Sequence, residues 1–72
     1  MEIKDRGFYV DFISGYFLLL RISGLRHKDG TCTWVVHKPG EDKEISVHTK
    51  KQDAMDCAMA RITTWKLQGK LK

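Results

Sequence analysis

The sequence predicts an α+β fold: a three- or four-stranded antiparallel β-sheet (meander) with one C-terminal α-helix packed on one face. Three observations predict it. Apolar and polar residues alternate with period two through most of the first two-thirds of the chain, where β-branched residues are frequent. Turn sequences that contain glycine separate these runs. Beyond residue 50, apolar residues recur at helical spacing. A chain of 72 residues has room for one small domain, 1–72.

The first strand is expected over residues 8–13, and a long, bent second strand over 16–28. Ser14 and Gly15 interrupt the apolar pattern between them, and both residue types favour turns. Whether the two runs form separate strands decides between three strands and four.

A hairpin is expected at Asp29-Gly30. This dipeptide favours a two-residue type I′ loop, because both central residues of that turn need a positive φ. Such a loop places Leu25 opposite Trp34, although the preceding leucines of the same strand have the other parity. A one-residue bulge next to Gly24 would reconcile the two patterns, since glycine is a frequent bulge residue.

The third and fourth strands are expected over 31–36 and 44–48. Both alternate with period two, and β-branched residues dominate the first of them. Pro39 and Gly40 turn the chain between them, because proline fixes its own φ and glycine accepts a positive one.

The C-terminal helix is expected over 50–67. Thr49 and Gln52 match a capping box, in which each side chain bonds the other residue's backbone N–H. Gly69 is placed to end the helix in a left-handed conformation. The basic tail, 68–72, follows the helix.

Strand parity then divides the side chains between two faces. The face toward the helix is expected to hold Leu18, Leu20, Ile22, Leu25, Cys32, Trp34, Val36, Ile45 and Val47, against Ala54, Ala58, Ile62 and Trp65. The other face is expected to hold Arg21, Arg26, Lys28, Thr31, Thr33, Val35, His37, Ser46 and His48.

Catalysis is not expected from this chain, nor is a cofactor or a small-molecule substrate. A ligand pocket of about 300–1,000 Å³ needs walls that so short a chain does not readily supply. The candidate nucleophiles are Cys32 and Cys57, but a buried cysteine mostly behaves as a small hydrophobic residue. The candidate bases, His27, His37 and His48, have no carboxylate pair beside them in a predicted cleft.

Metal, nucleotide and membrane binding are not expected either. The cysteines and histidines lack the spacings of zinc ligands, and the glycines lack the spacing of a phosphate-binding loop. The most apolar stretch, 8–22, contains Asp11 and Arg21 and falls short of the roughly 20 residues of a membrane span. Two cysteines without a secretion signal favour reduced thiols and a cytoplasmic location.

Nucleic-acid binding is one of two functions that the pattern favours. Thirteen basic residues against nine acidic ones give a net charge of +4. Lys and Arg that contact phosphates release counterions, and hydroxyl groups add phosphate contacts. The residues expected to contact nucleic acid are Arg21, Arg26, Lys28, Thr33, His37, Lys50 and Lys51.

The predicted architecture over 16–67 resembles two families of DNA-binding domain, the arm-site-binding domains of phage-type integrases and the plant AP2-type domain. The likeness consists of the hairpin at Asp29-Gly30, the strand of Trp34 and the helix capped at Thr49. It implies a sheet face that enters a DNA groove. No residue roles follow from it, because unrelated small proteins share this arrangement.

Protein–protein interaction is the other favoured function, and the one we expect. With a tight turn at Ser14-Gly15, one sheet face gathers a second apolar cluster that one helix cannot cover. An exposed apolar patch of this kind usually marks an interface. The chain is therefore expected to be a homodimer, or a regulator such as an inhibitor or adaptor of a larger protein. The expected interface residues are Phe8, Val10, Phe12, Phe17 and Leu19.

Overall fold

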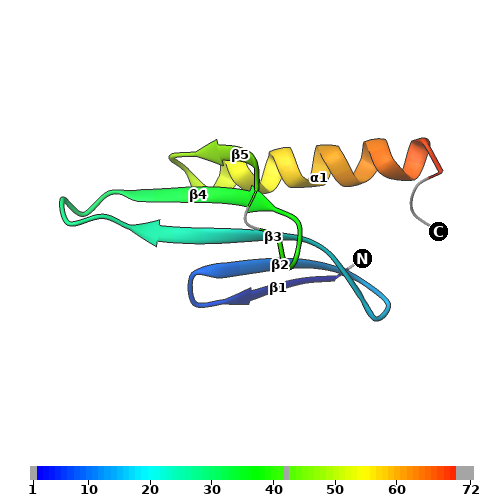
Figure 1. Ribbon diagram of the computed structural model, residues 1–72, viewed down its shortest axis with the longest axis horizontal. Helices are drawn as coiled ribbons and strands as arrows, with labels where there is room; N and C mark the ends of the chain where they lie inside the picture. The colour runs from blue at the N-terminus through cyan, green and yellow to red at the C-terminus, as the bar shows by residue number, and fades with distance from the viewer. Residues whose placement is uncertain (1, 42, 70–72) are drawn as a thin grey trace.

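The protein is a five-stranded antiparallel meander with one C-terminal helix, so the predicted α+β class is confirmed (Figure 1). The computed structural model describes residues 2–41 and 43–69. The strands follow the order of the sequence: β1 (Glu2–Arg6), β2 (Tyr9–Ser14), β3 (Phe17–Arg26), β4 (Cys32–His37) and β5 (Glu44–His48). The helix α1 (Lys51–Leu67) lies against β3, β4 and β5.

Strand β1 is the fifth strand that the sequence pattern did not predict. It pairs antiparallel with β2 across a turn at Gly7, whose φ is +61°. Every residue of β1 is exposed, and four of the five are charged. Charged side chains on an edge strand discourage pairing with other chains, but they also hide the period-two signal. Only Ile3 of this strand is apolar.

The connection between β2 and β3 differs from the predicted one by one residue. Ser14 pairs with Phe17, so the two-residue loop is Gly15-Tyr16, and Gly15 has a φ of +61°. A bulge follows, because Ile13 pairs with Leu18 whereas Phe12 pairs with Leu20. A one-residue change of register moves side chains to the opposite face of a sheet. The predicted second apolar cluster is therefore wrong, since its β2 residues join the core.

The β3–β4 hairpin has a three-residue loop in place of the predicted two-residue one. The backbone N–H of Gly30 donates to the His27 carbonyl, and the N–H of His27 donates to the Thr31 carbonyl. Gly30 has a φ of +90°. A turn followed by a left-handed glycine is the usual form of such a loop. Gly24 consequently pairs with Trp34, and this ladder continues without the predicted bulge.

The register of β5 corrects three predicted side-chain positions. Val36 pairs with Ser46 and Val35 with Val47, and a bulge follows before Glu44 pairs with His37. Ser46 faces α1, where its Oγ lies 3.2 Å from Cys57 Sγ. His48 shares that face, with Nε2 2.9 Å from Ser46 Oγ. Val47, predicted in the core, points away from the helix.

Helix α1 ends as predicted but begins differently. Its N-cap is Lys50, and no side chain caps it. The predicted capping box of Thr49 and Gln52 is therefore wrong, and the Gln52 amide donates to Asp56 instead. At the other end Gly69 has a φ of +73°, and its N–H donates to the Lys66 carbonyl. Of the predicted basic tail, residues 70–72 lie outside the described residues.

The core lies between α1 and the sheet. Its buried members come from β2, β3, β4 and the helix: Val10, Phe12, Leu20, Ile22, Val36, Ala54, Ala58 and Ile62. Leu19, Trp34, Ile45, Met55 and Trp65 are partly buried and pack against this cluster. Small residues on α1 let the helix approach the sheet closely. Within the described ranges, α1 is too short and too polar to cross a lipid bilayer.

Candidate interaction surface

The sheet has a second face, turned away from α1, which we call the outer face. The strand register aligns its side chains in rows that cross all five strands. Among the described residues, no helix covers this face (Figure 1). Its principal members are Lys4, Arg6, Tyr9, Asp11, Ile13, Arg21, Ser23, Leu25, Thr33, Val35, His37, Glu44 and Val47.

An apolar patch occupies the middle of the outer face. Val35 is only 8% exposed although none of the described elements lies over it. Leu25 is 52% exposed and Val47 50% exposed. Leu25 and Val35 line a shallow hollow, whose rim includes Glu41 from the β4–β5 loop. Both exposed members were predicted in the core, so the sequence pattern missed this patch.

No local signal in the sequence reveals the patch, because its position depends on the length of the β3–β4 loop. A three-residue loop shifts the partner of Trp34 from Leu25 to Gly24. Leu25 then takes the parity of the outer face, and so does Val47 through its pairing with Val35. Asp29-Gly30 is compatible with both loop lengths, because either loop can place glycine at a positive φ.

A row of polar side chains crosses the outer face beside the apolar patch. In register it runs Lys4, Asp11, Arg21, His37 and Glu44, one residue from each strand. Its strongest contact joins two neighbouring strands, where Arg21 Nε donates to Asp11 Oδ1 at 2.8 Å. The Asp11 carboxylate is nearly buried, at 4% exposure. Its hydrogen bond with Arg21 raises the pKa of the Arg21 guanidinium.

Ser23 and His37 form a second polar contact on this face. His37 Nδ1 lies 3.1 Å from the Lys38 carbonyl, which can only accept, so Nδ1 carries the proton. In the neutral ring His37 Nε2 then accepts from the Ser23 hydroxyl at 2.7 Å. Nucleophile and base pairs share this geometry. Ser23, however, lies in the central strand, whose N–H groups bond the flanking strands and are not free to stabilise an oxyanion. We therefore assign it no reaction.

The structure does not bring the seven predicted nucleic-acid-binding residues to one face. Arg21, Thr33 and His37 lie on the outer face, each hydrogen-bonded to another side chain of the protein. Arg26, predicted there too, pairs in register with Cys32 and takes the parity of the helix side. Its guanidinium carbon lies 5.2 Å from the centroid of the Phe8 ring.

The three predicted lysines lie at the same end of the molecule as Arg26. Lys28 is exposed in the β3–β4 loop, and Lys50 is exposed at the N-cap of α1. The Lys51 ammonium forms an ion pair with Asp5 of β1 and lies 5.9 Å from the centroid of the Trp34 ring. Lys51 therefore ties the helix to the edge of the sheet instead of presenting a free charge.

The predicted protein interface is also divided. Val10 and Phe12 are fully buried beneath α1, so they are not available to a partner. Leu19 is partly buried against the same core. Phe8 is half exposed and lies under Arg26, whereas Phe17 is 75% exposed at the β2–β3 turn. The five residues therefore do not form one surface.

Cys32 and Cys57 are both free and partly buried. In the part of the chain covered by the coordinates, no group of three or more His, Cys, Asp or Glu side chains could hold a metal ion.

Comparison of the chain with protein-family models, with curated proteins and with solved structures finds no match. The sheet of five strands also departs from the three strands of the DNA-binding domains that the predicted architecture resembles.

Proposed function

We propose that the chain is a small binding protein that recognises another protein through the outer face of its sheet. One observation carries the proposal: half-exposed Leu25 and Val47 flank Val35 on a sheet face that no described helix covers. Apolar groups gathered on one surface lose water when a partner covers them, which favours association. An inhibitor or an adaptor of a larger protein would act through such a face.

The polar groups beside the patch suit a protein partner better than a nucleic acid. Arg21 is neutralised by Asp11 and also lies over the Tyr9 ring, 5.2 Å from its centroid. Glu41 and Glu44 line the hollow next to Val35. These carboxylates would repel a phosphate backbone, whereas a protein surface can offer donors to them.

Capture from an extract of the native host tests the proposal. The tagged chain is compared with Leu25→Glu, which places a charge on the outer face, and with Met59→Glu, a matched control on the exposed side of α1. We expect the wild type and Met59→Glu to retain the same protein partner after nuclease treatment, and Leu25→Glu to lose it. Capture that is insensitive to Leu25→Glu would contradict the proposal.

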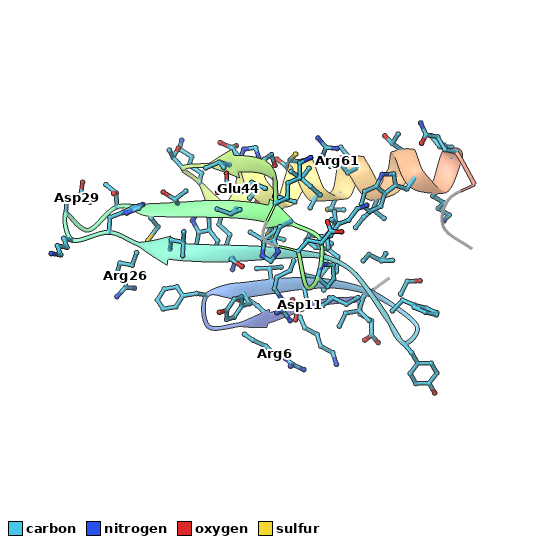
Figure 2. All side chains as sticks on the ribbon, viewed as in Figure 1. Arg6, Asp11, Arg26, Asp29, Glu44 and Arg61 are labelled. Carbon is cyan, nitrogen blue, oxygen red and sulfur yellow. The ribbon has the colours of Figure 1, made fainter. Side chains whose placement is uncertain are left out.

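Nucleic-acid binding is the second candidate function, and the β3–β4 hairpin favours it. Its loop extends beyond the neighbouring strands (Figure 1). Arg26, His27 and Lys28 are all exposed there, with Asp29 as the one acid of the loop. Figure 2 shows Arg26 and Asp29 at this end of the molecule, away from Glu44. Capture that disappears on nuclease treatment and on Lys28→Glu would select this function instead.

A further inference from the structure

We infer that the partner of the outer face is a second copy of this chain, related by a two-fold axis that runs parallel to β3. The inference rests on the proposed function of that face and specifies its occupant. It is carried by the way in which charge is distributed across the five strands, and by the position of the apolar patch relative to the proposed axis.

Opposite borders of the outer face carry opposite charges. On β1, Lys4 and Arg6 lie on this face, with Glu2 at the start of the strand. At the other border, Glu41 and Glu44 line the hollow beside β4. Figure 2 shows Arg6 and Glu44 at opposite edges of the sheet.

The basic residues of the β4–β5 loop are displaced from the acidic border. Lys38 and Lys43 line a different hollow, which they share with Arg61 of α1. The Lys38 ammonium also lies 5.7 Å from the centroid of the Trp65 ring. Glu41 and Glu44 line both hollows, so the acids reach the outer face while these lysines extend toward the helix.

A two-fold axis parallel to the strands brings the basic border of one copy onto the acidic border of the other. It places β1 of each copy over β5 of the other, because the order of the strands is reversed across the interface. Lys4 of one copy then lies over Glu44 of the second copy, and the symmetry repeats the contact. In the same row of the register, Asp11 lies over His37 of the second copy. Opposite charges meet along both borders.

The same operation brings Tyr9, Val35 and Leu25 together in the middle of the interface, whereas Val47 lies over Arg6 of the second copy. Tyr9 of β2 lies over Val35 of the second copy, since both belong to one row of the register. Leu25 belongs to the central strand and lies nearest the axis, where it meets its own counterpart. Arg21 also lies near the axis, and Asp11 already neutralises its charge. Aligned sheets pack about 10 Å apart, a spacing that side chains of this size fill.

The alternative two-fold axis, perpendicular to the strands, is disfavoured by the same charges. It would place β1 over β1 and β5 over β5. The basic border would then lie over the basic border of the second copy, and the acidic border over the acidic one, and like charges brought together across an interface are destabilising.

Sedimentation velocity over a concentration series tests the inference with a charge swap. Wild type is expected to dimerise, more weakly at high salt because salt screens the borders. Lys4→Glu and Glu44→Lys should each raise the Kd about tenfold or more, since every reversal alters two symmetry-related contacts. An equimolar mixture of the two variants should regain a heterodimer. Lys28→Glu, a reversal in the exposed loop, should leave the Kd unchanged.

Circular dichroism checks that each variant is folded, because Lys4 pairs with buried Asp11 and its reversal adds a second acid there. Lys4→Gln, which removes the positive charge without adding an acid beside Asp11, is the substitute if Lys4→Glu unfolds. A wild type that stays monomeric would overturn the inference, as would a mixture that fails to associate. Neither result contradicts the proposed function, because the capture experiment with Leu25→Glu tests separately whether the outer face binds a different protein.

Discussion

Gly24 shapes the core through the side chain that it lacks. A Cβ at this position would lie 2.7 Å from Trp34 Cζ3, and the Trp34 ring packs against the buried cluster. Gly24→Ala should therefore lower the free energy of unfolding by about 1–3 kcal/mol, the usual cost of overpacking. Urea denaturation measures it. In a Trp34→Leu background the same substitution should cost less, and equal costs in the two backgrounds would contradict the contact.

Asp29 gives the β3–β4 loop a dependence on pH. Its carboxylate accepts from the Thr31 hydroxyl at 2.6 Å and from the Thr31 N–H at 3.0 Å, and these bonds hold the Asp29 pKa below its usual value. The ionised form is thus favoured in the folded state. Its contribution to stability is present above the unfolded pKa and is lost as the pH falls through the lower folded one.

A carbon NMR titration of the Asp29 carboxyl group measures this shift directly. The midpoint should lie below that of an unstructured aspartate, and Thr31→Val should move it upward, because the side-chain hydrogen bond is the larger cause. A titration midpoint that is the same in Thr31→Val as in the wild type would show that the Thr31 hydroxyl does not bind the carboxylate.

At the scale of the elements, the start of α1 leaves room for improvement. Lys50 has the extended backbone of an N-cap, with φ −123° and ψ 138°, but its side chain cannot accept from the free N–H groups of the first turn. Lys50→Ser should raise the free energy of unfolding by about 1 kcal/mol. Thr49→Ala should change it by less than about 0.5 kcal/mol, because Thr49 is not the cap. A larger loss in Thr49→Ala would restore the capping box that the sequence suggests.

The strands show where a sequence pattern stops being informative. Alternation located β2 to β5, since Val10 and Phe12, or Trp34 and Val36, recur at period two. It could not locate β1, whose residues are charged on both faces. Nor could it choose the register, because a loop of two or three residues is equally compatible with Asp29-Gly30. One residue of register decided whether Leu25 lies in the core or on the surface.

At the scale of the whole molecule, the balance between sheet and helix points to a partner. The sequence suggested more apolar sheet than one helix can cover. The β2–β3 bulge removes part of that excess, because it sends Val10 and Phe12 into the core. The apolar residues of the sheet that the helix leaves uncovered lie on the outer face around Val35. A chain of this size buries only about 60% of its unfolded surface, so association adds burial that it cannot reach alone.

Local patterns in the amino-acid sequence predict the fold class, the position of the helix and four of the five strands, because periodicity and turn residues are local properties of a chain. The helix end at Leu67 and the turns at Gly30 and Gly40 followed from the same signals. The composition of each face was decided only by the tertiary structure. Faces depend on the register between strands that are distant along the chain, and a bulge or one added loop residue inverts them. For that reason Val10 and Phe12 of the predicted interface became part of the core, and a predicted core position, Leu25, became part of the proposed binding surface.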